Sequence, residues 1–226
     1  MGCEKCGGRG WILYKKDGID FAKPCECQEV MKARSRLDAS GISDEFHKKG
    51  FKNFSDRGKE VLRNARLKAI EYCKNYPEIK NTNRNSIIFM GQVGSGKTHL
   101  SMAICNNLMD CHKVGVIYMP YRDEITKIKQ TIKDEINYQN ALNRFKTCQA
   151  LMIDDLLKGK NTEADANILF EIINYRYLNM LPIIVSTEKT RDELLDFDEG
   201  VMSRVLEMTK DYQIEIIGEE YNYRLL

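Results

Sequence analysis

Short apolar runs alternate with longer amphipathic stretches over most of the chain. Such runs are typical of strands that are buried on both faces of a sheet, because neither face then meets water. The stretches between them are long enough to form helices that cover the sheet. We predict strands at 87–90, 114–119, 150–153, 183–186 and 213–217, and helices from about 97 and over 121–145, 163–180 and 192–209. This order predicts an α/β domain with a parallel sheet between two layers of helices.

The chain before this sheet follows a different pattern. Residues 11–14 and 19–22 predict two short strands joined by a glycine-containing turn. A basic, irregular segment is expected over 28–58. A helix with one apolar stripe follows, with Ser55 as its cap, and then a polar linker over 76–85.

The overall composition is that of a globular protein. The chain has 226 residues, of which 42% are hydrophobic, and a net charge of +2. No apolar run approaches the roughly 20 residues of a membrane helix, and no apolar signal segment opens the chain, so we expect a cytoplasmic protein without membrane contact. Basic residues exceed acidic ones over 32–84, which indicates either an anionic partner such as nucleic acid or a solvated helix face.

A glycine-rich segment follows the first strand of the expected sheet. Gly91, Gln92, Val93, Gly94, Ser95, Gly96, Lys97 and Thr98 match G-x-x-x-x-G-K-[ST] at every required position. Glycines let the backbone curve around a phosphate, and successive N–H groups at the start of the next helix favour the anion. We predict that this loop binds ATP, that Lys97 reaches the β- and γ-phosphates, and that the Thr98 hydroxyl binds Mg²⁺.

An acidic pair ends the strand expected over 150–153. We predict that Asp154 holds Mg²⁺, directly or through water, and that Asp155 orients or deprotonates the attacking water. Because Asp155 is one methylene shorter than glutamate, an adaptor that binds ATP and barely hydrolyses it stays an alternative. After the next strand, Ser186 or Thr187 would sense the γ-phosphate, and we assign this to Thr187. Capping of the following helix by either hydroxyl is the alternative.

Four of the eight cysteines lie at the two ends of the expected hairpin. Zinc takes four thiolates in a tetrahedron, and a unit of about 30 residues is too small to fold on a core of its own. We therefore predict a structural Zn²⁺ site, with a redox pair or a disordered tail as the alternatives. Its ligands would be Cys3, Cys6, Cys25 and Cys27.

Together these features resemble the AAA+ ATPases of the DnaC/DnaI/IstB group, over about residues 41–226. The resemblance rests on the phosphate loop and on three further segments, 151–155, 176–186 and Ser203-Arg204. Gly41-Ile42, with Phe51 and Phe54 after it, resembles the entry to that domain, which passes near the adenine. The implied division is a zinc-binding module and basic linker over 1–40, and an AAA+ P-loop ATPase domain over 41–226.

In that family an arginine after the sensor strand reaches the ATP of the neighbouring subunit, and Arg204 matches it. Its guanidinium would stabilise charge developing on the γ-phosphate and make hydrolysis dependent on self-association, whereas a salt bridge on the helix surface is the alternative. With the short Asp155 beside the water, we expect hydrolysis to be slow. Arg224 resembles the terminal arginine of the family, and we expect Arg176 to be structural. Many relatives have asparagine where this chain has Glu188, so the resemblance does not identify the sensing residue.

The resemblance implies a loader that places a DnaB-type hexameric helicase on single-stranded DNA at replication initiation, in a bacterium or a phage. The zinc module would grip the helicase. DNA contact is assigned to Lys127, Lys129 and Lys133, near Tyr121, because basic residues beside an aromatic ring suit single strands; a solvated helix face is the alternative. A second candidate is an IstB-type transposition helper that binds duplex DNA and a transposase, although such proteins usually lack the cysteine module.

Overall fold

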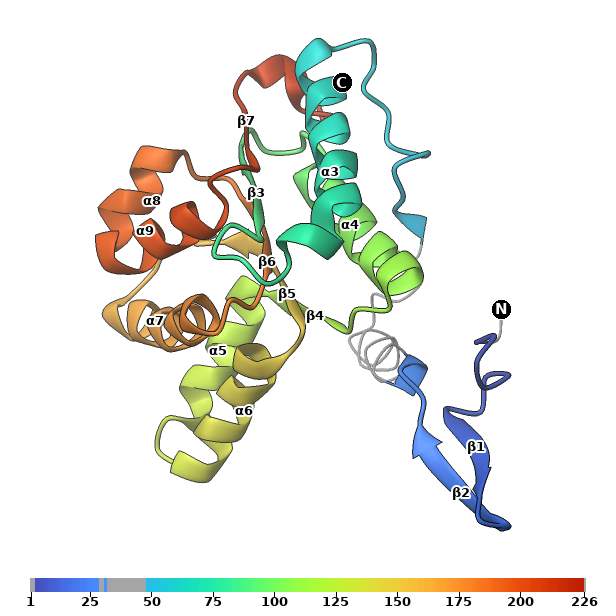
Figure 1. Ribbon diagram of the computed structural model, residues 1–226. Coiled ribbons are helices and arrows are strands. Elements are labelled where there is room, and N and C mark those ends of the chain that lie inside the picture. Colours follow the sequence, from blue (N-terminus) through green and yellow to red (C-terminus); the bar gives the residue numbers. More distant parts are fainter. Residues whose placement is uncertain (1–2, 29–30, 32–47, 226) are drawn as a thin grey trace.

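A computed structural model describes residues 3–28, 31 and 48–225 (Figure 1). These residues form a small hairpin and an α/β domain. The expected boundary between residues 40 and 41, and the Gly41-Ile42 entry segment, lie outside the described residues. The division of the chain at that point therefore stays a prediction.

The hairpin consists of β1 (Trp11–Lys16) and β2 (Ile19–Pro24), which pair antiparallel. Tyr14 and Phe21 lie opposite each other, and their rings stack with centroids 5.6 Å apart. Almost all of the strand side chains are exposed. A two-stranded sheet of this kind has no core of its own and needs another source of stability.

A five-stranded sheet lies at the centre of the α/β domain within the described residues. In spatial order its strands are β4 (Val116–Pro120), β5 (Ala150–Leu156), β6 (Ile183–Thr187), β3 (Ile87–Gly91) and β7 (Gln213–Ile216). Neighbouring strands are parallel throughout, so all of them end at the same edge. The ends of β5, β6 and β3 lie side by side there, which is where parallel α/β sheets place their ligands.

Helices cover both faces of the sheet, as the alternating pattern predicts (Figure 1). On one face lie α3 (Glu60–Ile79) and α4 (Lys97–His112); on the other lie α5 (Tyr121–Thr131), α6 (Glu135–Thr147), α7 (Glu163–Leu178), α8 (Arg191–Phe197) and α9 (Glu199–Met208). A 3₁₀ turn over Glu219–Tyr221 follows β7. The α/β fold class with three layers is confirmed.

Alternate residues of β3 face the two helical layers. Ile87 and Phe89 belong to the core under α3 and α4, whereas Ile88 and Met90 belong to the core on the opposite face. All four are at most 2% exposed. This double burial explains why the strand is a continuous apolar run rather than an alternation of apolar and polar residues.

Arg176 on α7 is fully buried and joins three elements through their backbones. Its Nη1 donates to the carbonyls of Phe145 at 2.8 Å and Cys148 at 3.0 Å, and its Nη2 donates to that of Pro182 at 2.7 Å. These carbonyls lie near the end of α6 and just before β5 and β6. The structural role expected for Arg176 is confirmed.

The single helix expected over 121–145 is wrong, because the chain forms α5 and α6 with a break between them. The Asp134 side chain accepts from the Asn137 N–H at 3.1 Å and so caps a new helix. The spacing of Ile125, Ile128, Ile132 and Ile136 in the sequence favours one helix with a single apolar face, and Ile125 and Ile128 are buried. Beyond the break, Ile132 and Ile136 are 47% and 75% exposed, so the isoleucines do not form one apolar face.

The expected boundaries of α3 are also wrong. Its N-cap is Lys59 rather than Ser55, because Arg57 and Gly58 adopt positive φ and turn the chain before the helix begins. The helix continues through Pro77 to Ile79 instead of giving way to a linker. Pro77 lies in the last turn, where a lost hydrogen bond costs little beside the burial of the preceding turns.

In the described part of the chain, no helix is both long enough and apolar enough to cross a bilayer.

Candidate functional site

The phosphate loop joins β3 to α4 at the edge where the strands end. Gly91 and Gly94 have φ of 98° and 70°. A Cβ on Gly91 would overlap the Ile216 carbonyl, and a Cβ on Gly94 would overlap the Asn222 side chain. Glycine is therefore required at both positions by close packing as well as by backbone conformation. The first turn of α4 has no side-chain cap, so its N–H groups face the loop in the way that suits an anion.

Lys97 lies at the start of α4 and is only 5% exposed. Its Nζ donates to the loop carbonyls of Gly91 at 2.8 Å and Gln92 at 2.6 Å. Burial lowers the pKa of Lys97 to about 8, and the carboxylates of Glu188 and Asp155 oppose this, Glu188 more strongly. A buried ammonium that is held only by carbonyls has much to gain from a phosphate partner.

Asp154 lies near the end of β5 and accepts three hydroxyl hydrogen bonds. Its Oδ1 accepts from Thr98 at 2.8 Å and from Ser186, and its Oδ2 accepts from Tyr118 at 2.9 Å. The pKa of Asp154 is raised, because burial outweighs the effect of these bonds. The structure thus brings together Thr98 and Asp154, the two side chains predicted to bind Mg²⁺. A hydroxyl and a carboxylate are oxygen ligands of the kind that Mg²⁺ prefers.

Tyr118 is a site residue that sequence reasoning missed. It lies on β4, where it pairs in register with Met152, two residues before Asp154. A hydroxyl within an otherwise apolar strand is the available signal. That signal gains meaning only when the order of strands is known, because β4 must be the neighbour of β5 for the contact to form.

Asp155 directly follows Asp154 and adopts a positive φ of 54°. Its N–H donates to Ser186 Oγ at 3.0 Å, and its Oδ2 accepts from Lys158 Nζ at 2.7 Å. Lys158 also pairs with Glu188 at 3.0 Å. Sequence reasoning did not single out Lys158, although its position three residues after the acidic pair is a usable signal for such a contact.

Thr187 makes two backbone contacts through its hydroxyl. The hydroxyl donates to the Leu156 carbonyl at 2.7 Å and accepts from the Lys189 N–H at 3.1 Å. The sensing role assigned to Thr187 has no support in this geometry and stays a prediction. The alternative role in capping is wrong, because Thr190 caps α8 by accepting from the Glu193 N–H.

The segment after β7 lies against the phosphate loop. The Tyr223 N–H donates to the Gly94 carbonyl at 2.9 Å, and the Arg57 guanidinium lies 4.3 Å from the Tyr223 ring centroid. The Arg224 N–H donates to Asn222 Oδ1 at 3.0 Å. Arg224 therefore lies close to the phosphate loop. The resemblance between the terminal motifs does not by itself establish this position.

The family model for the bacterial DnaA ATPase domain matches residues 47–209, which is most of the chain. The chain belongs to this family of AAA+ ATPases.

Individual relatives refine this assignment. The AAA+ chain is 37% identical over 231 residues to the phage-like element PBSX protein XkdC of Bacillus subtilis, covering 99% of this chain and 86% of that protein. It is 25% identical over 202 residues to the replicative helicase loader DnaC of Escherichia coli, covering 85% and 80%. A crystal structure of the DnaC helicase loader matches with a TM-score of 0.67 at 20% identity, over 76% of this chain and 98% of that one. The predicted DnaC/DnaI-like AAA+ ATPase is confirmed.

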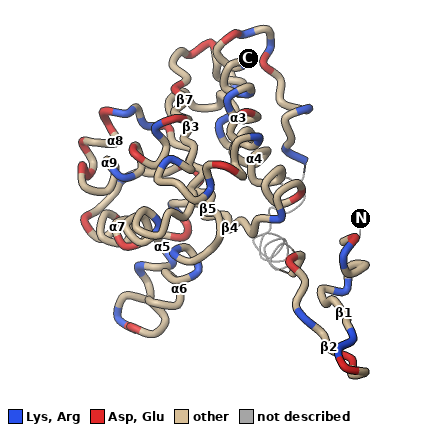
Figure 2. The backbone as a smooth tube through the Cα atoms, in the orientation of Figure 1, with Lys and Arg blue, Asp and Glu red and all other residues tan. Residues whose placement is uncertain are grey.

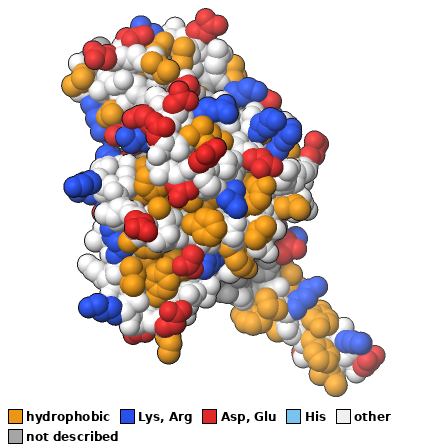
Figure 3. All heavy atoms as spheres, turned by 90° about the vertical axis from the view of Figure 1, so that its left-hand side faces the viewer, with side chains coloured by type: hydrophobic (Ala, Val, Ile, Leu, Met, Phe, Trp, Pro, Cys, Tyr) orange, Lys and Arg blue, Asp and Glu red, His pale blue; other side chains and the backbone are white. Residues whose placement is uncertain are grey.

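Arg204 of the AAA+ chain lies on α9 and is bracketed by two aromatic rings. Its guanidinium is 5.5 Å from the Phe170 centroid and 5.7 Å from the Tyr177 centroid, and it donates to the Gly200 carbonyl. Phe170 is 43% exposed. Figure 3 shows hydrophobic side chains among charged ones on the side that carries α8 and α9. The predicted action of Arg204 on a neighbouring subunit stays a prediction.

Two of the lysines assigned to DNA form ion pairs. Lys127 Nζ lies 2.7 Å from Glu124, and Lys129 Nζ lies 2.7 Å from Asp165. Lys133 lies in the break between α5 and α6. Acidic and basic residues are mixed along both helices in Figure 2. Part of the positive charge expected to meet DNA is thus neutralised within the AAA+ domain, and the assignment stays a prediction.

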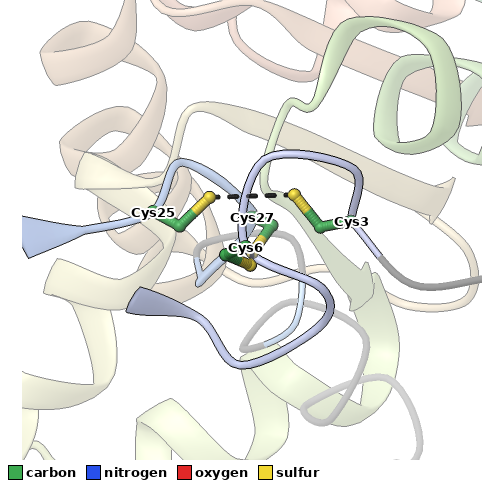
Figure 4. A group of neighbouring side chains, drawn as sticks. All are labelled: Cys3, Cys6, Cys25 and Cys27. Carbon is green, nitrogen blue, oxygen red and sulfur yellow. Dashed lines mark hydrogen bonds between the residues drawn. The ribbon is translucent and has the colours of Figure 1, made fainter. Parts of the chain in front are cut away.

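The four N-terminal cysteines converge at the base of the hairpin (Figure 4). Their Sγ atoms all lie within 4.8 Å of one another, with Cys6–Cys27 at 3.4 Å and Cys3–Cys25 at 3.7 Å. A tetrahedron with Zn–S bonds of about 2.3 Å has S–S edges of about 3.8 Å, so these spacings fit zinc. The Gly10 N–H donates to Cys6 Sγ at 3.3 Å, a bond that stabilises a thiolate. The cluster is compatible with a metal site.

Proposed function

We propose that this AAA+ ATPase uses ATP to load a DnaB-type hexameric replicative helicase onto single-stranded DNA during replication initiation. The observation that carries the proposal is its similarity to the DnaC helicase loader, which extends over 85% of the chain. A loader of this kind must bind nucleotide, and the phosphate loop with its acidic partners supplies such a site.

Within that site we assign the phosphates to the loop over 91–98. Lys97 would contact the β- and γ-phosphates, and Thr98 and Asp154 would hold Mg²⁺, which neutralises charge on the phosphates when bound. Asp155 would orient the attacking water. Support for these roles comes from the hydrogen bond that joins Thr98 to Asp154 and from the carbonyl contacts of Lys97.

We further propose that copies of the chain associate side by side, so that Arg204 acts on the ATP of a neighbour. The aromatic rings that bracket it on α7, of which Phe170 is 43% exposed, support an interface on this face. Single-stranded DNA contact is assigned to Lys127, Lys129 and Lys133. Among the described residues Lys133 forms no ion pair, which makes it the strongest of the three candidates.

The N-terminal region over 1–40 would act as the zinc-binding module and linker that grips the helicase, and 41–226 as the ATPase domain. Cys3, Cys6, Cys25 and Cys27 would bind the zinc. The exposed hydrophobic side chains of the hairpin, such as Trp11 at 48% and Leu13 at 64%, support a contact role, because monomeric domains rarely expose such residues together.

The test is helicase loading on a circular single strand that carries an annealed forked oligonucleotide. With ATP, the full chain should increase unwinding by the replicative helicase of its host. A Cys25→Ser/Cys27→Ser variant should lose capture of the helicase but retain ATP binding. Unwinding that is equal with and without the chain, under conditions where the chain binds ATP, would refute the loader function and favour another ATP-dependent role such as a transposition helper.

A further inference from the structure

A second carboxylate lies beside Asp155 at the edge of the sheet that carries the phosphate loop. Lys158 Nζ is 2.7 Å from Asp155 Oδ2 and 3.0 Å from Glu188 Oε1. Asp155 is the penultimate residue of β5, and Glu188 directly follows the neighbouring strand β6; Leu156 and Thr187 pair in register between these strands. One ammonium group therefore holds together two carboxylates from adjacent strands.

The turn after β5 fixes this arrangement through its backbone. Asp155 and Leu157 have φ of 54° and 60°, which residues other than glycine adopt only where the surroundings enforce it. The Lys158 N–H donates to the Asp155 carbonyl at 3.0 Å, and the Asn161 side-chain amide donates to the Leu157 carbonyl at 3.0 Å. Lys158 is thus held beside the two acids by the turn itself.

The order of the strands places Glu188 beside the phosphate loop. β6 lies between β5 and β3 in the sheet, so Glu188, which directly follows β6, lies between the end of β5 and the loop after β3. A phosphate held by this loop would lie at the same edge of the sheet. The side chains of Asp155 and Glu188 are 35% and 30% exposed, so water can reach both.

We propose that Glu188 is a further catalytic residue, which shares with Asp155 the holding and deprotonation of the attacking water. Lys158 is the positioning residue that keeps the two acids together. The water oxygen forms a bond to the γ-phosphorus, the bond to the β–γ bridging oxygen breaks with its electron pair leaving on ADP, and the water proton passes to the carboxylate. The longer side chain of Glu188 supplies reach that Asp155 lacks. The inference rests on ATP hydrolysis in the proposed function.

The test compares ATP turnover and ATP affinity of the full chain with those of Glu188→Gln, Asp155→Asn and the double variant. Glu188→Gln should lower kcat at least about tenfold, and the double variant about 100-fold or more, because general-base catalysis typically contributes 10²–10⁴-fold. The Kd for ATP should not change. The matched control is Glu193→Gln, which neutralises another partly exposed glutamate paired with a lysine and keeps the α8 cap, since glutamine also suits that position.

Variants of Lys158 separate positioning from a merely structural role. Lys158→Gln should lower kcat without changing the Kd for ATP, and Lys158→Arg should restore much of kcat, because a guanidinium can also bridge two carboxylates. An unchanged or raised kcat in Lys158→Gln would overturn the positioning role.

Two results separate this inference from the function on which it rests. If wild-type protein hydrolyses ATP and Glu188→Gln matches Glu193→Gln in kcat, or loses ATP affinity instead, the inference on Glu188 is overturned alone. If the wild-type chain binds no ATP, the proposed function is overturned.

Discussion

The cysteine hairpin and the ATPase domain hold their structures by different means. In the hairpin the strands are exposed, and the buried side chains of its described residues are those of Cys6, Cys25 and Cys27. In the ATPase domain, by contrast, the strands are buried between two helical layers. If the four cysteines bind zinc as we propose, the hairpin should unfold in one step when the metal is removed. The layered core of the ATPase domain should instead lose stability gradually as single contacts are removed.

Metal removal should unfold the hairpin and leave the ATPase domain intact. Structural zinc sites supply an apparent free energy of about 10–16 kcal/mol, far more than two exposed strands can replace. Trp11 is the single tryptophan of the chain, so its fluorescence reports on the hairpin alone. A zinc-selective chelator, with Mg²⁺ kept in excess, should change Trp11 emission and leave ATP affinity unchanged.

Single cysteine substitutions sharpen the same test. Cys27→Ser should abolish stoichiometric zinc, measured by elemental analysis, while Cys111→Ser, at an exposed cysteine of the ATPase domain, should not. Full zinc content in Cys27→Ser would contradict the claim that metal stabilises the hairpin. Trp11 emission that does not change when the chelator is added would contradict it as well.

Arg176→Leu should destabilise the ATPase domain by about 3–5 kcal/mol, because it leaves several buried carbonyls without a donor. Urea unfolding followed by circular dichroism measures the change, and Trp11 emission should stay native below the transition. The control is Arg84→Leu, whose exposed ion pair with Asp211 should contribute less than about 1 kcal/mol. Equal unfolding midpoints for the two variants would show that the buried contacts of Arg176 do not stabilise the domain.

Tyr118→Phe should destabilise the ATPase domain by about 1–2 kcal/mol, because Asp154 loses one of its three hydroxyl donors while staying buried. The urea midpoint measures this loss. Tyr14→Phe, on the exposed hairpin, should leave that midpoint unchanged. A Tyr118→Phe midpoint equal to that of wild type would show that the contact adds nothing to the site.

Asp198→Ala should have the smallest effect, about 1 kcal/mol, through loss of the cap that accepts from the Val201 N–H at 2.9 Å. Asp198→Asn keeps an accepting oxygen and should recover most of the loss. If the alanine and asparagine variants melt at the same temperature, the cap does not stabilise α9.

The sequence predicts the local features of both regions. Spacing alone places the four cysteines at the ends of a hairpin, and apolar runs place all five sheet strands close to their observed bounds. The phosphate loop is equally visible, because its chemistry lies within eight consecutive residues. In each case the signal is local along the chain.

Features that depend on distant contacts could not be predicted in this way. Tyr118 reaches Asp154 only because β4 lies beside β5, and Tyr223 binds Gly94 only because the chain returns to the loop after β7. The break between α5 and α6 was missed for a different reason. Isoleucines at helical spacing favoured one long helix, but the Asp134 side chain caps a new helix there.

Binding of Mg²⁺-ATP, measured by calorimetry on the full chain, tests the central claim that the phosphate loop holds nucleotide through Lys97. Wild-type protein and Lys113→Ala, which alters a lysine just beyond the opposite end of α4, should bind ATP equally well. Lys97→Ala should bind at least about tenfold more weakly, because a hydrogen bond to a charged group contributes about 1.5–3 kcal/mol. Equal ATP affinities for Lys97→Ala and Lys113→Ala, or no ATP binding by the wild-type chain, would show that the phosphate loop does not hold nucleotide through Lys97.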